Sequence, residues 1–243
     1  MKLKVLGSGS SGNCYILESD TEALIIEAGV PFKDVKVALG FNVRKIVGVI
    51  ASHEHKDHSK YITEYERAGI RTFTPYEISN HETAECNYMG NFRIKDFALT
   101  DKNGVFKHTN SDGSECPCYG FYISHKDIGS MVYISDTELV KWNFKKLKLN
   151  HILLEANYSD DLIDNEAVNR EHVLRGHMSL QTALDFISTN DNPALRNVVL
   201  LHLSDKNSNS EQFLQKTKET IKHGADCYIA EKGLEVDLNL CPF

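Results

Sequence analysis

One short segment, H-E-H-K-D-H at residues 53–58, limits what this chain can fold into more than any other stretch of its sequence. It follows a continuous apolar run at residues 46–51, which is typical of a strand covered on both faces. The histidines are therefore expected in a loop at the edge of a buried sheet. Imidazole and carboxylate groups are suitable ligands for Zn²⁺, Mn²⁺ or Fe²⁺, and a merely solvated polar loop explains such a concentration poorly. In an extended loop the first two histidines share one cation, while the aspartate and the last histidine face a second.

Three further ligand-type residues each follow an expected strand. They are His108, Asp136 and His202. The runs that precede them, V-F-K, M-V-Y-I-S and V-V-L-L, are typical of strands. Each residue alone could equally cap a strand or belong to a turn. The histidine loop alone has too few ligands for two metal ions. Together, these three residues are therefore predicted to complete the coordination of two ions at this end of the sheets.

The loop L-G-S-G-S-S-G-N at residues 6–13 contains the spacing G-x-G-x-x-G, which in dinucleotide-binding proteins joins a strand to a helix. Here a strand is expected before the loop at residues 2–6, but two short strand-like runs follow it, at residues 14–17 and 23–27. Without a helix N-terminus the loop cannot hold a pyrophosphate, which argues against dinucleotide binding. Contact with a substrate phosphate and a plain tight turn both remain open for its polar residues, Ser8, Ser10, Ser11 and Asn13.

Length and composition limit the organisation of the chain. Its 243 residues are 41% hydrophobic, and the absence of a low-complexity segment or Pro-rich linker predicts a single domain over residues 1–243. No apolar run approaches the roughly 20 residues of a membrane span, and no signal-peptide core precedes the first strand. Six cysteines without a paired framework indicate reduced thiols and a cytoplasmic location. The net charge of −7 argues against a nonspecific nucleic-acid coat, but not against an enzyme whose site carries positive charge as metal ions.

The order of the expected elements predicts the fold class. Strands are expected at residues 2–6, 14–17, 23–27, 46–51, 71–73, 92–95, 104–108, 119–124, 131–135, 151–155, 198–202, 227–230 and 234–238. Helices are expected at residues 31–39, from an N-cap at Ser59 to residue 68, from Pro75, at residues 179–187 and at residues 211–223. The last two strands are expected to form a β pair that turns through Lys232 and Gly233. This order predicts two β-sheets between layers of helices.

With its ligand pattern the sequence resembles the metallo-β-lactamase-fold hydrolases, from the glycine loop to His202. The resemblance implies an α/β architecture, a four-layer αββα sandwich of two mixed β-sheets flanked by helices. It also implies a dinuclear site at the sheet edges with two divalent ions, Zn²⁺ or Mn²⁺, as cofactors. The implied ligands of one ion are His53, His55 and His108, and those of the other are Asp57, His58 and His202, with Asp136 bridging both. One departure is Glu27, which stands where the family usually has aspartate and is expected to rearrange the hydrogen bonds behind the ligands.

The surroundings of the ligands distinguish between the reactions of the family. His55 stands where the redox branch has a carboxylate, which argues against redox iron chemistry. The residues around His108 lack the T-P-G-H-T context of glyoxalase II and lactonase relatives, whereas P-C-Y-G-F at residues 117–121 is similar to a stretch of phosphodiesterase and tRNA-processing relatives.

Two residues outside the ligand set resemble the proton-relay pair of nuclease members, Glu155 and His177. In such a pair the carboxylate raises the pKa of the imidazole, which then protonates the leaving alkoxide. A buried strand-end glutamate and a histidine at a helix start are the structural alternative. The expected catalytic residues are Asp57, Glu155 and His177.

Four stretches, G-S-G-S-S-G-N, E-A-N, G-H-x-S and H-L-S, are similar to those of the small bacterial YycJ-like (WalJ) subgroup, which is linked to DNA exonuclease activity. The expected function is therefore metal-dependent phosphodiester hydrolysis at DNA ends, with DNA favoured over RNA as the nucleic-acid substrate. One alternative is a small-molecule hydrolase, such as a cyclic-nucleotide phosphodiesterase, thioesterase or lactonase. Another is a catalytically silent metal-binding module, against which the full ligand set argues.

Overall fold

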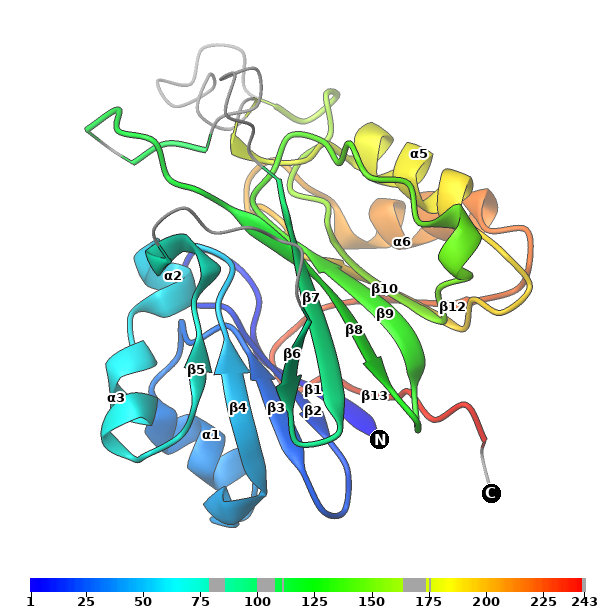
Figure 1. Cartoon of the computed structure of the whole chain (residues 1–243). Coiled ribbons are helices and arrows are strands. Elements are labelled where there is room, and N and C mark those ends of the chain that lie inside the picture. Colours follow the sequence, from blue (N-terminus) through cyan, green and yellow to red (C-terminus); the bar gives the residue numbers. More distant parts are fainter. Residues whose placement is uncertain (79–85, 100–107, 111, 164–173, 175, 242–243) are drawn as a thin grey trace.

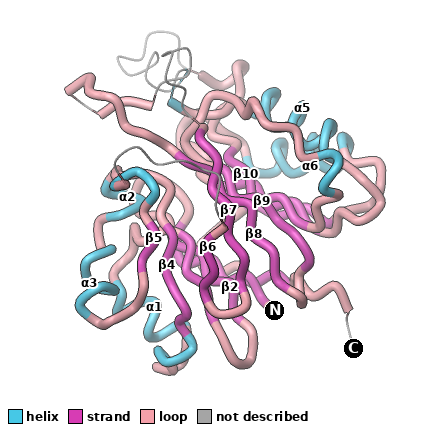
Figure 2. The backbone as a smooth tube through the Cα atoms, in the orientation of Figure 1, coloured by secondary structure: helices cyan, strands magenta, loops and turns pink. Residues whose placement is uncertain are grey.

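The computed structural model describes residues 1–78, 86–99, 108–110, 112–163, 174 and 176–241. Two β-sheets pack face to face, and helices cover the outer face of each sheet (Figure 1). Figure 2 shows the same layers, with the strands in magenta between the helices in cyan. Both sheets contain parallel and antiparallel pairs. The expected α/β sandwich of two mixed sheets is confirmed.

The first sheet has the strand order β13-β1-β2-β3-β4-β5. Its strands are β1 (Lys2–Gly7), β2 (Cys14–Glu18), β3 (Ala23–Ile26), β4 (Ile46–Ile50), β5 (Thr72–Phe73) and β13 (Glu235–Asp237). The elements on its outer side are α1 (Phe32–Ala38), η1 (Val43–Lys45), α2 (Lys56–Ser59), α3 (Ile62–Arg67) and η2 (Pro75–Glu77). Among the described strands of this sheet, only the neighbouring pairs β3–β4 and β4–β5 are parallel.

The second sheet has the strand order β12-β11-β10-β9-β8-β7-β6. Its strands are β6 (Asn87–Met89), β7 (Phe92–Ala98), β8 (Tyr119–His125), β9 (Gly129–Ile134), β10 (His151–Glu155), β11 (Asn197–Leu201) and β12 (Asp226–Ile229). The elements α5 (Leu180–Asn190), α6 (Ser210–Thr220) and η3 (Lys145–Leu147) lie outside it. The strands β9 to β12 are parallel, so their carboxyl ends share one edge.

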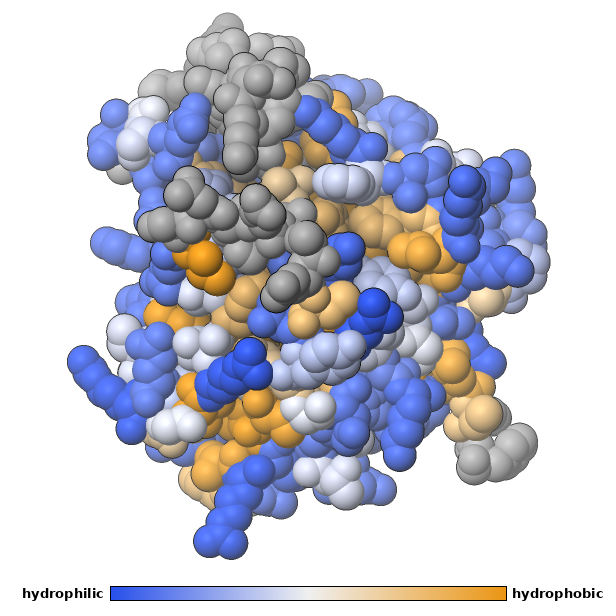
Figure 3. Space-filling model, viewed as in Figure 1, coloured by the Kyte–Doolittle hydropathy of each residue, from blue (hydrophilic) through white to orange (hydrophobic). Residues whose placement is uncertain are grey.

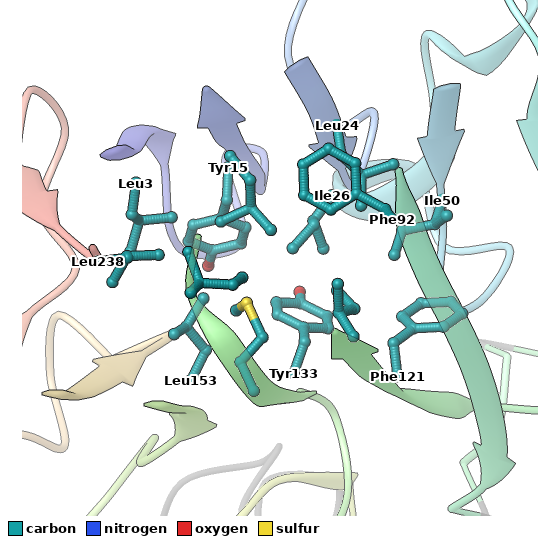
Figure 4. Packing of buried hydrophobic residues seen from close by; sticks show 14 of the residues in the cluster. Leu3, Tyr15, Leu24, Ile26, Ile50, Phe92, Phe121, Tyr133, Leu153 and Leu238 are labelled. Carbon is teal, nitrogen blue, oxygen red and sulfur yellow. The ribbon is translucent and has the colours of Figure 1, made fainter. Parts of the chain in front are cut away.

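The main apolar core lies between the two sheets. Tyr15 of β2 and Tyr133 of β9 face each other there, with ring centroids 5.6 Å apart, and Tyr133 also stacks with Phe121 (Figure 4). A second cluster fills the space between the second sheet and α5 and α6, and a third lies between the first sheet and α1 and α3. Every residue of β3 and of β10 is buried, as expected for strands covered on both faces.

Three expectations about local structure are wrong. The final β pair does not form, because β12 pairs with β11 in the second sheet while β13 pairs with β1 in the first. The turn through Lys232 and Gly233 carries the chain from one sheet to the other, where Gly233 N donates to Val5 O. Ser59 is not an N-cap. It ends α2, and its hydroxyl donates to the carbonyls of Glu54 and His55 at 2.8 and 3.2 Å.

The third error concerns the helix from Pro75, which is only the 3-10 turn Pro75–Glu77 in the described part of the chain. The strand expected at residues 104–108 lies outside the described residues except for His108. The remaining expected strands and helices are present with small shifts at their ends. No helix among the described residues combines the length and the apolarity that crossing a membrane requires.

Candidate metal centre

The histidine loop is held in place by backbone hydrogen bonds from two neighbouring loops. Asn13 N donates to Asp57 O at 2.7 Å, and Ala28 N donates to His58 O at 2.6 Å. Gly29 N in turn donates to Asn13 O at 2.9 Å. The loops after β1, β3 and β4 are thus tied together at one edge of the first sheet. This fixes where the side chains of residues 53–58 point.

The structure brings together every sequence-predicted site residue. His53, His55 and His108 form one group whose ligand atoms all lie within 4.8 Å of one another, and Asp57, His58 and His202 form another. Asp136 belongs both to a group with His53 and His58 and to a group with Glu155, His177 and His202. Asp136 therefore lies between the two ligand groups, as a bridging ligand requires.

In the first group the inner imidazole nitrogens converge, while the outer nitrogens of His53 and His55 are hydrogen-bonded. His55 Nδ1 and His108 Nε2 lie 2.9 Å apart, and the buried Nε2 of His53 has no hydrogen-bond partner among the described residues. On the outside, His53 Nδ1 lies 2.9 Å from Ser52 Oγ, and His55 Nε2 lies 3.0 Å from Asn110 Oδ1. Metal-binding histidines characteristically have their second nitrogen hydrogen-bonded in this way.

Burial keeps this group in its metal-binding form. It lowers the pKa of His108 to about 4, and it also lowers the pKa of His53 well below its ordinary value, with the positive charge of nearby His58 adding to the effect. Both imidazoles are therefore neutral at physiological pH, and neutral imidazole is the form that binds a cation. The unpartnered His53 Nε2 and the all-nitrogen donor set fit a divalent ion such as Zn²⁺.

The second group combines carboxylates with histidines. His58 Nε2 lies 2.9 Å from Asp136 Oδ2 and 3.4 Å from Asp57 Oδ2, and His202 Nε2 lies 3.8 Å from Asp57 Oδ2. Burial alone would lower the pKa of His58, but the carboxylates of Asp136 and Glu27 raise it well above its ordinary value. The carboxylates thus create a site that favours positive charge, which a divalent ion supplies. This mixed donor set fits Zn²⁺ or Mn²⁺.

Glu27 lies directly behind His58. Its two carboxylate oxygens accept from Ser52 N at 3.3 and 3.2 Å, and Oε1 lies 3.4 Å from His58 Nδ1. Its backbone is left-handed, with φ of 66°, as are those of Asp136 at 54° and His202 at 55°. Each of these residues comes within two positions of the end of a strand. The left-handed conformation turns the chain sharply there, at a cost of about 1–2 kcal/mol for a non-glycine residue.

Glu155 connects His177 with His202. Its Oε1 accepts from His177 Nδ1 at 2.7 Å and lies 3.2 Å from His202 Nδ1, while Oε2 accepts from Thr137 N at 3.2 Å. Burial lowers the pKa of His177, but the Glu155 carboxylate outweighs it and raises that pKa to about 9. His177 therefore holds a proton beside Asp136, whose Oδ1 lies 3.3 Å from its Nδ1.

Sequence reasoning missed the role of the glycine loop. Asn13 Nδ2 lies 2.9 Å from His58 Nε2, and Ser8 Oγ accepts from His202 N at 2.9 Å. The loop therefore braces one ligand from each sheet, in addition to making a tight turn. The glycine spacing was the available signal, since a Cβ at Gly7 would lie 2.2 Å from Gly12 O. Asn110, which holds His55, gave no comparable signal.

Comparisons with known proteins agree with this arrangement. Residues 7–60 match the model of the metallo-beta-lactamase superfamily. The chain is 24% identical over 239 residues to the exodeoxyribonuclease WalJ of Streptococcus pneumoniae serotype 2, covering 86% of this chain and 84% of that protein. It is 32% identical over 177 residues to the exodeoxyribonuclease YycJ of Bacillus anthracis, covering 67% and 65%.

Solved structures show the same fold at low sequence identity. The metallo-beta-lactamase fold protein YhfI of Bacillus subtilis superimposes with a TM-score of 0.68 at 17% identity, covering 97% of this chain and 98% of that one. The short form of human tRNase Z superimposes with a TM-score of 0.63 at 15% identity, covering 99% and 100%.

Proposed function

The chain carries a metallo-beta-lactamase superfamily domain, and from that premise we propose that it is a metal-dependent hydrolase of phosphodiester bonds that acts as an exonuclease on DNA. One divalent ion would be held by His53, His55 and His108. The other would be held by Asp57, His58 and His202, with Asp136 shared. When bound, such a pair supplies Lewis acidity, which makes water nucleophilic at neutral pH and neutralises charge on the phosphodiester.

The observation that carries the proposal is the hydrogen bond from His177 to Glu155 beside the ligand groups. Hydrolysis of a natural phosphodiester releases a sugar alkoxide, which needs a proton. Hydrolysis of a thioester releases a thiolate, which leaves readily without one. An imidazolium whose Nδ1–H is held by a buried carboxylate can donate the proton on its other nitrogen, Nε2, to the leaving alkoxide as a general acid. Glu155 keeps the ring oriented, because the same carboxylate is fixed by Thr137 N.

Asp57 is assigned to the attacking side of the reaction. Its side chain is 22% exposed, against 3% for Asp136, so it is the more accessible of the two acidic ligands. A carboxylate in that position orients the attacking water by hydrogen bonding. Asp136 then remains a buried structural ligand between the two groups.

The names of the curated relatives support DNA as the substrate, since both are exodeoxyribonucleases. A cytoplasmic location is part of the proposal, because all six cysteines are unpaired and reduced thiols persist in that compartment.

End-labelled oligonucleotides test the proposal. The purified protein would be incubated in Mn²⁺ or Zn²⁺ with single-stranded DNA, double-stranded DNA and RNA of the same sequence, and we expect stepwise release of mononucleotides from DNA. Asp136→Asn serves as the matched control for a contaminating nuclease and should be inactive. Failure to cleave DNA in either metal, together with rapid turnover of bis-p-nitrophenyl phosphate or of a lactone, would instead assign the site to a small-molecule substrate.

A further inference from the structure

A surface segment that begins beside the metal centre has an unusual composition. Residues 137–148 contain four lysines and one glutamate, in a chain whose net charge is −7. The segment follows Asp136 directly, and Thr137 anchors its start, since Thr137 N donates to Glu155 Oε2 at 3.2 Å. From there it runs along the outer face of the second sheet beside α5, where Phe144 packs against Phe186 with ring centroids 6.1 Å apart (Figure 1).

Three lysines of this segment are exposed and close together in sequence. They are Lys145, Lys146 and Lys148, which directly precede the amino end of β10 and so lie toward the edge of the second sheet away from Asp136. A bound strand would therefore cross the outer face of the sheet to reach them. Within the described residues, none of their ammonium groups forms an ion pair with a carboxylate. In Figure 3 the right-hand edge of the molecule is hydrophilic, and apolar patches lie beside it. Neighbouring unpaired cations repel one another, so such a cluster favours an anionic partner.

Trp142 provides a flat apolar ring within the same segment. It is the only tryptophan of the chain, and it is 50% exposed. Its Nε1 donates to Ala98 O at 3.0 Å, and its ring lies edge-on to Phe97 with centroids 6.3 Å apart. The ring is therefore fixed from behind while half of its surface faces solvent. A ring held in this way is suited to stacking with a planar ligand.

Trp142 is connected to the metal centre through the sheet. Ala98 pairs with Tyr119 across β7 and β8, Tyr119 N donates to Ser52 O at 3.1 Å, and Ser52 Oγ lies 2.9 Å from His53 Nδ1. Trp142 lies six positions after Asp136, which limits the distance between their Cα atoms to about 20 Å. That distance corresponds to a few nucleotides of a single strand.

We propose that residues 137–148 bind the single strand of DNA that leads into the metal centre, with Trp142 stacking on a base and the three lysines contacting phosphates. This inference rests on the proposed function and adds the surface that holds the substrate beyond the bond that is cut. Proteins that bind single strands without sequence preference combine aromatic side chains that stack on bases with cationic side chains that contact the phosphate backbone. An anionic membrane also attracts lysines, but continuity with Asp136 and Glu155 favours the substrate of the site itself.

Tryptophan fluorescence gives a direct readout, because Trp142 is the only emitter of its kind. A phosphorothioate oligothymidylate of fifteen nucleotides, which resists hydrolysis, should quench the emission of the metal-loaded protein. Thymidine monophosphate should quench much less, since it is too short to reach both the site and the ring. Vesicles containing phosphatidylserine should leave the emission unchanged.

Variants of Trp142 and of the three lysines separate the contributions of stacking and of charge. In anisotropy measurements with a labelled oligonucleotide, Trp142→Ala should weaken binding about tenfold, or about 1.4 kcal/mol, because one stacked base is lost, and Trp142→Phe should weaken it much less. Changing Lys145, Lys146 and Lys148 to Gln should lower the slope of log K against log salt by about 2, since each phosphate contact on a single strand contributes about 0.7. The matched control changes Lys126, Lys218 and Lys222 to Gln, which removes the same charge from exposed positions elsewhere.

Hydrolysis of bis-p-nitrophenyl phosphate keeps the two proposals distinguishable. All these variants should hydrolyse this small ester as the unchanged protein does. If the unchanged protein cleaves DNA, and both Trp142→Ala and the variant of Lys145, Lys146 and Lys148 bind and cleave it normally, the segment is not the strand-binding surface. A fluorescence change with vesicles and none with DNA would also overturn the inference. If DNA is not cleaved at all, the proposed function itself is at fault.

Discussion

At the scale of single residues, Glu155 serves two histidines with one carboxylate oxygen, holding His177 at 2.7 Å and lying 3.2 Å from His202. This arrangement predicts an asymmetry between substrates when His177 is removed. General-acid help is worth about 10²–10⁴-fold for a leaving group that needs a proton. We expect His177→Ala to lose roughly that factor in kcat on DNA and far less on p-nitrophenyl esters, whose phenolate leaves unaided.

Metal content and further variants test whether the effect of His177→Ala is the loss of a general acid. Elemental analysis of His177→Ala should equal that of the unchanged protein, and Glu155→Gln should show the same asymmetry more mildly. His223→Ala, which removes only a part-exposed partner of Asp191, should change neither substrate. Equal losses on DNA and on the aryl ester, or loss of a metal, would make His177 a ligand or a structural residue.

At the scale of elements, the loops after β1, β3 and β4 meet so closely that Gly29 has no room for a side chain. A Cβ there would lie 1.8 Å from Asp57 O and 2.6 Å from Asn13 N, both of them backbone atoms. Gly29→Ala must therefore displace the histidine loop. We expect a loss of about 3 kcal/mol in the free energy of unfolding, at the upper end of overpacking costs, together with reduced metal content.

Urea unfolding and elemental analysis check this expectation against Gly69→Ala. Gly69 ends the turn after α3 with φ of 74°, and no atom of the described residues lies within 4 Å of its added Cβ. That variant should cost only about 1 kcal/mol of backbone strain and keep its metal. Equal effects of the two substitutions would show that the tight contact at Gly29 does not position the ligands.

At the scale of the whole molecule, the candidate metal centre joins the two sheets. The loop after β4 of the first sheet supplies His53 to His58, and the second sheet supplies Asp136 and His202 from the ends of β9 and β11. We expect two metal ions per chain by elemental analysis and a lower midpoint of thermal unfolding after chelation, because ions that bind only the folded state stabilise it. Asp136→Ala should lose at least one ion. A stoichiometry of one that survives this substitution would contradict the bridging role.

A second contact between the sheets lies at the start of β3, at the opposite end from the ligands. The Glu22 carboxylate accepts from Asn91 N at 2.9 Å, from Asn91 Nδ2 at 2.8 Å and from His125 Nε2 at 3.0 Å. Burial raises the pKa of Glu22, but the hydrogen bonds from Asn91 and His125 outweigh it and lower that pKa below its ordinary value. Its stabilising effect is therefore complete above the unfolded pKa of about 4.3 and is lost as the pH falls further.

Glu22→Gln tests this pH dependence. Urea unfolding should show a loss of about 1–3 kcal/mol at pH 7, and the difference from the unchanged protein should shrink below about pH 4. Glu235→Gln, in an exposed pair with Lys2, should change stability by less than about 0.5 kcal/mol at either pH. A loss that persists unchanged at low pH would mean that the charge of Glu22 contributes nothing.

The sequence by itself determined which residues end the strands and what chemistry they carry. The apolar runs before Asp136 and His202 have the pattern of buried strands. Such a pattern can be recognised from consecutive residues alone, without knowledge of the tertiary structure. The nine candidate site residues could be selected from the sequence because each lies in or beside a recognisable local motif, and the structure brings them together.

Only the tertiary structure decided how distant segments meet. The partner of β13 is β1, more than two hundred residues away, although its neighbour in the sequence is β12. Likewise, Asn13 lies against His58, and Glu155 serves both His177 and His202. Periodicity records which face of an element is buried, but not against what it is buried. Strand pairing and shared hydrogen bonds depend on contacts between segments far apart in the chain, and the packing of the two sheets selects those contacts.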